Sequence, residues 1–318
     1  MNTRNKKITI LGVGNVGASI AYSLVIDGMC SEIVLVDINK DKARGEVIEL
    51  RQSAVFCPSV KISYGDYADA VDSDIVVVTL GMARKPGQTR LDLAQTNTNI
   101  MKQIMPEVAK YAPNAIYVIV SNPVDIMTYA ALKSTNLSPS QVIGTGTLLD
   151  TIRLQEGLSE YLDISTSNVQ AYVLGEHGDS SMVPWSFASV AGMPLIEYCK
   201  LMTKKDESVI REELNVVYKD MQTSGSNIIK LKGATYYGVA LCVRHLCDAL
   251  FRHGDIILPV SVLMQGQYGM EDVCLSLPTV INSNGVKQII EYPFNDEEKE
   301  KLLFSYNALK STLSKIQN

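Results

Sequence analysis

The sequence has only three histidines and six cysteines among 318 residues, and neither set is spaced like a metal site. There is no Cys-x-x-Cys and no close pair of histidines, which disfavours both a zinc centre and a disulfide framework. We therefore expect no bound metal, and reduced, mostly buried thiols in a cytosolic protein. The cysteines are Cys30, Cys57, Cys199, Cys242, Cys247 and Cys274.

Long hydrophobic runs and an excess of positive charge are also missing. No stretch approaches the roughly 18 apolar residues of a membrane span. Glycines interrupt the apolar segment after the basic start, which argues against a signal peptide. The net charge of −5 gives no general attraction to nucleic acid or to anionic lipid, so we expect neither as a partner. Any anion site must then be local, built from helix ends and a few arginines.

The first half of the chain alternates short β-branched runs with longer helical patterns. The runs lie at 7–11, 32–36, 75–79 and 115–120, and they are apolar almost throughout. Strands of this kind are buried on both faces, which predicts a parallel sheet between two layers of helices. The fold class is therefore α/β, with a doubly wound (Rossmann) sheet. We find no internal repeat and no low-complexity tract.

The pattern changes near residue 145, where we place a domain boundary. Helices are predicted around 148–163 and 206–231, a strand at 169–174 and hairpins around 256–282. Residues 1–144 would form the nucleotide-binding domain, and residues 145–318 a C-terminal α+β catalytic domain. No Pro/Ser linker separates them, so we expect the two to pack tightly.

Gly12-Val13-Gly14-Asn15-Val16-Gly17 follows the first predicted strand and opens a helix. About twenty positions later, Asp37 ends the second strand, which is the context of a dinucleotide-binding site. The glycines would permit a tight turn, a close approach of the pyrophosphate and close packing of helix on strand. Asp37 would accept hydrogen bonds from ribose hydroxyls and repel a 2′-phosphate, so NAD is preferred over NADP.

Two polar segments follow other strands at the same predicted sheet edge. The loop from Arg84 to Arg90 contains Pro and Gly, and two arginines beside a nucleotide crevice predict a lid over an anionic substrate. Asn122, after another strand, could donate a hydrogen bond to a substrate oxygen, and Pro123 could fix the turn through a cis bond.

His177 lies in Gly175-Glu176-His177-Gly178-Asp179, a run with little helix or strand propensity. Asp150 and Arg153 stand three positions apart, so one helix face would present a carboxylate and a guanidinium to one pocket. A histidine, an acid to orient it and an arginine to hold an anion can together move a proton on an oxygen of a carboxylate-bearing substrate.

Taken together, these residues resemble the L-lactate/L-malate dehydrogenase family almost from end to end. The shared segments are the glycine motif, 85–93, 122–125, Asp150 with Arg153, 175–179 and 232–237. The resemblance implies an NAD-dependent L-2-hydroxy-acid dehydrogenase in which His177 is the acid/base, Asp150 orients it, Arg153 grips the substrate carboxylate and Arg90 polarises the ketone. The predicted cofactor contacts are Gly12, Gly14, Val16, Gly17, Asp37, Gly81, Asn97 and Asn122.

The resemblance leaves the substrate open between two small 2-oxo acids. Arg84 stands where lactate-type members usually carry glutamine and malate-type members carry arginine, so it favours oxaloacetate/L-malate. Thr235 and the sequences of the other loops and helices resemble bacterial lactate dehydrogenases, which makes pyruvate/L-lactate the alternative. A larger 2-oxo acid is a third possibility. Thr235 is a predicted substrate contact with Arg84, Arg90, Asn122 and Arg153.

Two further expectations concern regulation and assembly. Gln155 and Gln170 occupy positions where members activated by fructose 1,6-bisphosphate carry an arginine and a histidine, so we expect no such activation. Amphipathic helices around 45–54 and 206–231 suggest a homo-oligomer, a dimer or a tetramer. Two other classes of function are less favoured. A non-catalytic NADH sensor would not need Asp150, Arg153, Arg90 and His177 together. An NAD-dependent glycosidase would need a metal held by cysteine and histidine, and the sequence has no such pair near the predicted crevice.

Overall fold

The computed structural model describes residues 6–82, 89–252 and 254–316. Within these residues nine strands form one sheet, in the order β12-β11-β10-β6-β5-β4-β1-β2-β3. The six strands of the first half run parallel in the 3-2-1-4-5-6 order, which confirms the predicted doubly wound sheet. They are β1 (Lys7–Leu11), β2 (Glu32–Val36), β3 (Lys61–Gly65), β4 (Ile75–Val78), β5 (Ile116–Ile119) and β6 (Val142–Gly144).

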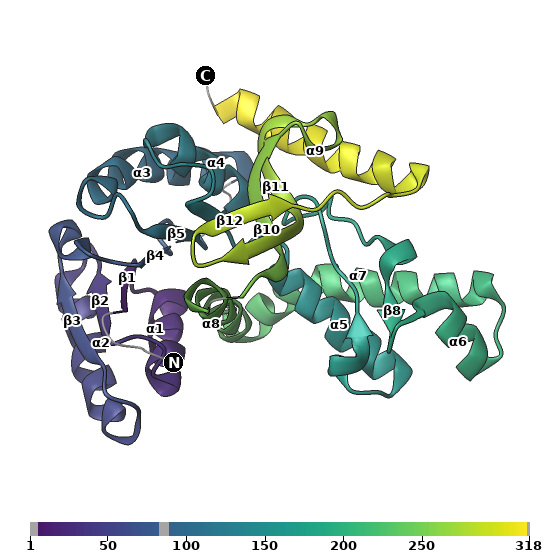
Figure 1. Ribbon diagram of the computed structural model, residues 1–318, viewed down its shortest axis with the longest axis horizontal. Coiled ribbons are helices and arrows are strands. Elements are labelled where there is room, and N and C mark those ends of the chain that lie inside the picture. Colours follow the sequence, from purple (N-terminus) through teal and green to yellow (C-terminus); the bar gives the residue numbers. More distant parts are fainter. Residues whose placement is uncertain (1–5, 83–88, 253, 317–318) are drawn as a thin grey trace.

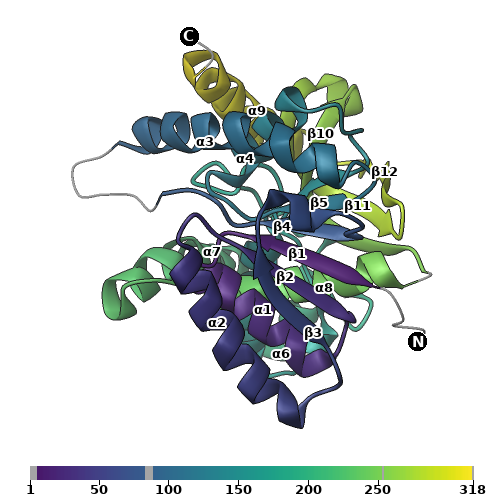
Figure 2. The ribbon, with the colours of Figure 1, turned by 90° about the vertical axis from the view of Figure 1, so that its left-hand side faces the viewer.

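Helices cover both faces of this sheet because its strands are apolar on both sides (Figures 1 and 2). In β4, Ile75 and Val77 face one apolar core, whereas Val76 and Val78 face the other. The first core is closed by α1 (Asn15–Asp27), α2 (Lys40–Ser53) and α8 (Tyr237–Phe251). The second is closed by α3 (Arg90–Tyr111), α4 (Val124–Ser134) and α9 (Asp296–Ile316).

The second half of the chain extends the same sheet. β10 (Ile256–Gln265), β11 (Glu271–Asn282) and β12 (Gly285–Ile289) run antiparallel to one another. β10 pairs with β6 where Ser261 lies opposite Gly144. The sheet therefore continues across the boundary that we place near residue 145, and the tight packing of the two halves includes backbone hydrogen bonding.

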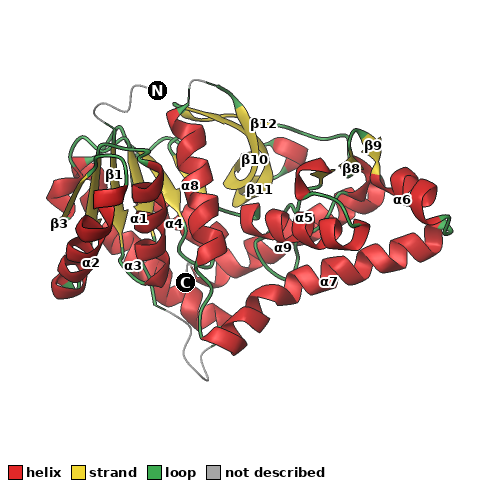
Figure 3. Cartoon of the chain, turned by 90° about the horizontal axis from the view of Figure 1, so that it is seen from below, coloured by secondary structure: helices red, strands yellow, loops and turns green. Residues whose placement is uncertain are grey.

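A smaller lobe, with a third apolar core, lies beyond the sheet (Figure 3). It contains α5 (Leu148–Leu162), α6 (Leu195–Thr203), α7 (Glu207–Lys232) and a short sheet of β7 (Val169–Gln170), β8 (Ser189–Val190) and β9 (Met193–Pro194). Short 3₁₀ turns complete the described elements: Ala54–Phe56, Tyr67–Ala70, Thr166–Asn168, Trp185–Phe187 and Gln267–Gly269.

The strand predicted at 169–174 is wrong beyond Gln170. The chain leaves β7 and then changes partner repeatedly: Val173 N–H donates to Oγ1 of Thr151, and Leu174 pairs with Met182. Because no single strand runs alongside, residues 171–174 make isolated contacts and do not continue the strand. This segment connects the small lobe to the loop that contains His177.

In the part of the chain that the structure describes, no helix combines the length and apolarity needed to cross a bilayer. All six cysteines are free, five are buried and Cys57 is half-buried. The prediction of mostly buried, unpaired thiols is therefore confirmed.

Candidate active site

The carboxyl ends of the parallel strands meet at one edge of the sheet, where the predicted cofactor residues begin. Gly12 follows β1 with φ of +90°, and a Cβ there would lie 2.8 Å from the carbonyl oxygen of Thr79. A Cβ on Gly17 would lie 2.0 Å from the carbonyl oxygen of Gly12, so only glycine permits this packing of α1 on the turn. A Cβ on Gly14 would meet nothing within 4 Å.

This glycine turn has the features of an anion cradle. Gly14 is the N-cap of α1, and no side chain caps the helix. The uncapped helix start, with open space beside Gly14, suits the pyrophosphate of a dinucleotide. Asp37, after β2, accepts hydrogen bonds from the backbone N–H of Val13 (2.6 Å) and of Asn39 (2.8 Å). The carboxylate is thus fixed next to the turn, as the fit to NAD requires.

Gly81, Asn97 and Asn122 are brought together at the ends of β4 and β5. Gly81 has φ of +129°, and a Cβ there would lie 3.0 Å from the side-chain amide of Asn97. Asn97, on α3 and 3% exposed, accepts from Met82 N–H (2.8 Å) and donates to the carbonyl oxygen of Asn122 (2.8 Å). Asn122 is exposed, and its bond to Pro123 is cis, as predicted. Asn97 therefore fixes two loops of the crevice at once.

The three residues expected to do the chemistry are also in contact. Asp150 and Arg153 lie in the first two turns of α5, and Oδ1 of Asp150 is 3.3 Å from Nη1 of Arg153. Oδ2 of Asp150 is 2.5 Å from Nδ1 of His177. The contact to Asp150 leaves Nε2 as the imidazole nitrogen that can meet a substrate. A quarter of the His177 side chain is exposed, so a small molecule can reach it.

The charges of this group stabilise one another. Burial of the imidazole opposes its charged form, but the Asp150 carboxylate outweighs burial and raises the pKa of His177 to about 9. Burial likewise opposes ionisation of Asp150, yet His177 and Arg153 hold the pKa of Asp150 below its usual value. At neutral pH the group is therefore an imidazolium, a carboxylate and a guanidinium.

Not every predicted residue is placed by the structure. Arg84 lies outside the described residues, and so does the side chain of Arg90, although the backbone of α3 begins there. Thr235 is half-buried between α7 and α8, and the described hydrogen bonds do not connect it to His177. Val16 is half-buried in the first turn of α1.

Two residues of the site were missed from the sequence. Asp125 accepts the backbone N–H of His177, and its position in an otherwise apolar helix start, between Val124 and Ile126, was the available clue. Ile38 follows Asp37 and is 99% exposed, so an apolar side chain comes directly after the carboxylate predicted to bind ribose. Its exposure could not be inferred from the sequence, because most isoleucines are buried.

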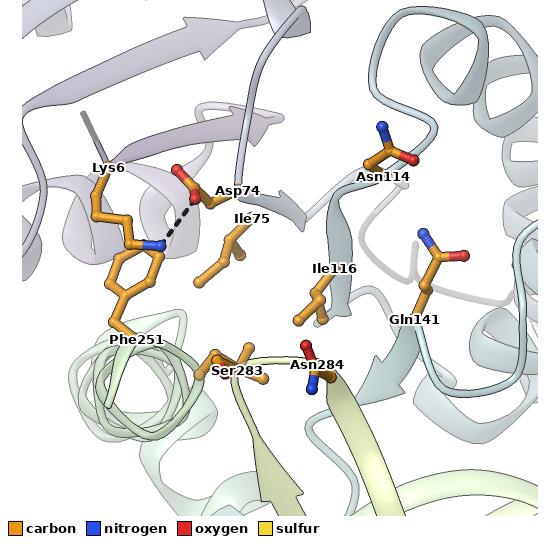
Figure 4. Close-up of a pocket in the computed structure, with 10 residues that line it drawn as sticks. Lys6, Asp74, Ile75, Asn114, Ile116, Gln141, Phe251, Ser283 and Asn284 are labelled. Atoms are coloured by element: carbon orange, nitrogen blue, oxygen red, sulfur yellow. Dashed lines mark hydrogen bonds and ion pairs between the residues drawn. The ribbon is translucent and has the colours of Figure 1, made fainter. Parts of the chain in front are cut away.

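A separate cavity of about 320 Å³ lies at the opposite edge of the sheet, where β4 and β5 begin (Figure 4). Nζ of Lys6 donates to Asp74 (3.0 Å) and lies 5.2 Å from the centre of the Phe251 ring. The amide nitrogen of Gln141 donates to two backbone carbonyl groups. Since these polar groups are satisfied within the protein, we assign no reaction to this cavity. The described residues hold no group of three or more His, Cys, Asp or Glu side chains suited to a metal ion.

Two family models match the chain along its length. The model of the lactate/malate dehydrogenase NAD-binding domain matches residues 6–144, and that of the lactate/malate dehydrogenase alpha/beta C-terminal domain matches residues 147–318.

Individual relatives agree with these matches. L-lactate dehydrogenase 1 of Clostridium acetobutylicum is 47% identical over 313 residues, covering 98% of this chain and 99% of the relative. The L-lactate dehydrogenase of Acetivibrio thermocellus is 45% identical over 311 residues, covering 98% of this chain and 97% of the relative. The crystal structure of the minor L-lactate dehydrogenase from Enterococcus mundtii superposes with a TM-score of 0.93 at 37% identity, covering 98% of each chain. A lactate dehydrogenase from a Medee basin deep-sea metagenome library has a TM-score of 0.94 at 39% identity, covering 99% of this chain and 100% of that chain.

Proposed function

The chain belongs to the lactate/malate dehydrogenase family of NAD-dependent oxidoreductases acting on a CH–OH group, and we propose that it interconverts pyruvate and L-lactate. The observation that most directly supports a reaction on a small 2-oxo acid is the contact group of His177, Asp150 and Arg153. A 2-oxo acid presents a carboxylate for the guanidinium and a neighbouring ketone oxygen for the imidazole. One small substrate would therefore use both charged groups at once.

NAD would lie along the carboxyl edge of the sheet. The turn of Gly12, Gly14 and Gly17 would receive the pyrophosphate, with Val16 in the same first turn of α1. The Asp37 carboxylate would accept the ribose hydroxyls, and its charge disfavours a 2′-phosphate. Gly81, Asn97 and Asn122 would border the half of the crevice nearer to His177. When bound, reduced NAD supplies the hydride for the ketone carbon.

In pyruvate reduction, His177 would deliver a proton from Nε2 to the ketone oxygen. Asp150 holds Nδ1 at 2.5 Å, which fixes the ring and compensates the positive charge before the proton leaves. In the direction of lactate oxidation, the neutral imidazole would accept the hydroxyl proton at the same nitrogen. The rate in each direction thus depends on the protonation state of His177.

Arg153 would bind the substrate carboxylate. A planar guanidinium offers two parallel N–H donors, a geometry that lysine cannot reproduce. The contact of Nη1 with Asp150 orients the guanidinium and still leaves other N–H groups free to donate. Arg90, which resemblance to the family assigns to the ketone, would act on charge that develops in the transition state. Asn122 and Thr235 would complete the substrate contacts.

The choice of pyruvate rests on the relatives, which are named L-lactate dehydrogenase. Arg84 favours the second candidate, oxaloacetate/L-malate, because its guanidinium could pair with the extra carboxylate. If Arg84 were buried opposite the methyl group of pyruvate, the unpaired charge would cost about 2–5 kcal/mol. An arginine with a long stem can instead turn its charge toward water, which removes most of this cost. We therefore give the relatives more weight than this single position.

A substrate comparison tests the choice. We expect a higher kcat/KM with pyruvate than with oxaloacetate, measured by NADH consumption, in the wild type. The Arg84→Gln variant should then lower kcat/KM for oxaloacetate and leave that for pyruvate within a few fold. Preference of the wild type for oxaloacetate, abolished by Arg84→Gln, would replace pyruvate with the dicarboxylic acid.

We also propose that the protein is a cytoplasmic homo-oligomer, a dimer or a tetramer. Apolar side chains remain exposed at the two helices named from the sequence. In and after α2 they include Ile48 and Phe56, and in α7 they include Val216 and Leu231. Their burial against further copies of the chain would remove this apolar surface from water.

A further inference from the structure

Asp125 is a buried carboxylate to which the proposed reaction assigns no step. It lies in the first turn of α4 and is 2% exposed. Its Oδ1 accepts a hydrogen bond from Oγ of Ser261 on β10 (2.6 Å), and its Oδ2 accepts from the backbone N–H of His177 (2.8 Å). A buried charge is costly unless it is compensated. The position of the Asp125 carboxylate against the backbone of His177 therefore calls for a physical reason.

The His177 loop is held through consecutive backbone N–H groups, each bound by a different element. Gly175 N–H donates to the carbonyl oxygen of Ser276 on β11 (2.9 Å), and Glu176 N–H donates to Oγ of Ser305 on α9 (2.6 Å). His177 N–H donates to Asp125 on α4. Neutral oxygens suffice at the first two positions, so holding the backbone does not by itself require a carboxylate at the third.

What a carboxylate adds is negative charge next to the imidazole. Burial raises the pKa of Asp125 to about 6, while the Ser261 hydroxyl and the His177 N–H favour its ionised form. Asp125 is therefore an anion at neutral pH and above. Its charge acts on His177 in the same sense as that of Asp150, favouring the protonated ring.

Resting on the proposed function, we propose that Asp125 is a positioning residue whose anion both fixes the backbone of His177 and favours the protonated imidazole needed for reduction. Two carboxylates then act on one histidine, Asp150 at Nδ1 and Asp125 at the backbone nitrogen.

The other ionisable groups packed around the pair come from three elements. Arg153 on α5 opposes protonation of His177, and Glu176 in the same loop opposes ionisation of Asp125. Cys274 on β11 is fully buried, and burial, reinforced by Asp125, raises the pKa of its thiol well above the usual value, so it stays neutral. Around the His177 ring, Asp125 and Asp150 favour the imidazolium, whereas Arg153 opposes it.

The substitution Asp125→Asn separates charge from hydrogen bonding. The asparagine oxygen can still accept from His177 N–H, and its NH2 group can donate to the Ser261 hydroxyl, which can also accept. We expect the NMR titration midpoint of the His177 ring to fall by about half a pH unit or more. The pH above which the rate of pyruvate reduction falls should decrease by the same amount. The Kd for NADH should stay unchanged, because Asp125 does not border the glycine turn proposed to bind the nucleotide.

Ser261→Ala is the matched control, since it removes a hydrogen bond to the same carboxylate but keeps the charge. We expect its His177 midpoint to match that of the wild type. An unchanged midpoint in Asp125→Asn would overturn the proposal and leave Asp125 with a purely structural role. The ring titration is recorded without substrate, so it tests Asp125 even if pyruvate proves to be the wrong substrate.

Reciprocity supplies a second test that does not need a folded Asp125→Asn protein. If Asp125 stabilises the imidazolium, the imidazolium must stabilise the Asp125 carboxylate by the same free energy. In protein carrying 13C-labelled aspartate, His177→Gln should therefore raise the titration midpoint of Asp125. A midpoint identical to that of the wild type would contradict the coupling.

Discussion

At the scale of single residues, the proposed catalysis depends on the ion pair between His177 and Asp150. The carboxylate raises the pKa of His177 from the ordinary 6.5 to about 9, against the effect of burial. Since the folded-state pKa is the higher one, the protonated imidazole contributes its full stability below about pH 6.5, as long as Asp150 stays ionised. This contribution is lost as the pH rises through about 9.

The same shift predicts the pH dependence of catalysis. Reduction needs the protonated ring, so kcat/KM for pyruvate should be constant near neutral pH and fall as the pH rises through about 9. Oxidation of L-lactate needs the neutral ring and should rise over the same interval. Both profiles are measurable by NADH absorbance in overlapping buffers.

Asp150→Asn provides the control for this prediction. Without this carboxylate, burial and the Arg153 charge oppose protonation of the ring, and Asp125 still favours it. We therefore expect the fall of the reduction rate with pH to occur at a lower pH than in the wild type, along with a lower maximal rate. A limb that stays in place would show that Asp150 does not set the protonation of His177.

At the scale of elements, the turn between β1 and α1 contains two glycines in different surroundings: Gly17 is tightly packed, and Gly14 has open space beside it. Gly17→Ala would place a Cβ 2.0 Å from a carbonyl oxygen, so we expect a loss of stability of roughly 1–3 kcal/mol. Gly14→Ala meets nothing within 4 Å and should fold normally, yet bind NADH more weakly because the methyl group occupies the space proposed for the pyrophosphate.

Gly45→Ala, on an exposed position of α2 with nothing within 4 Å, is the matched control. It should raise stability slightly, as replacing glycine inside a helix usually does, and leave NADH binding unchanged. Urea unfolding and NADH fluorescence titration measure both quantities. Equal NADH affinity of Gly14→Ala and the wild type would contradict the proposed pyrophosphate site.

The contact between α5 and the segment after β7 supports a prediction about regulation. Nε2 of Gln155 donates to the carbonyl oxygen of Ala171, next to Gln170. Both glutamines are neutral and cannot compensate a phosphate charge. We therefore expect millimolar fructose 1,6-bisphosphate to leave the apparent KM for pyruvate unchanged. A clear fall in that KM, measured at low substrate, would show that an effector site exists.

The elements that the sequence predicted best are those with long apolar runs or strong helical periodicity. β1 and β2 have the predicted bounds, and α5 and α7 differ from prediction by one residue or so at each end. β3 was not predicted because only one of its five residues is buried, so it lacks the apolar run that marks the other strands. β6 was not predicted because it has only three residues. Local sequence contains too little information to identify such strands.

At the scale of the whole molecule, the sequence could not predict contacts that join its two halves. The antiparallel extension of the sheet depends on the pairing of Ser261 with Gly144, which no local pattern indicates. The contact between Asp125 and His177 joins residues 52 positions apart. Motif spacing did predict the group of Asp150, Arg153 and His177, because the first two share a helix face and the third stands out by composition. Residues whose role depends on burial, such as Asp125, require the folded chain.

The division of the molecule into a nucleotide-binding half and a half that supplies His177 leads to the most direct test. In His177→Asn, the glycine turn and Asp37 are untouched, so the Kd for NADH should equal that of the wild type. The turnover of pyruvate should fall by about 10²- to 10⁴-fold, the usual contribution of a general acid. Undiminished NADH consumption by this variant, at the same NADH affinity, would contradict the account.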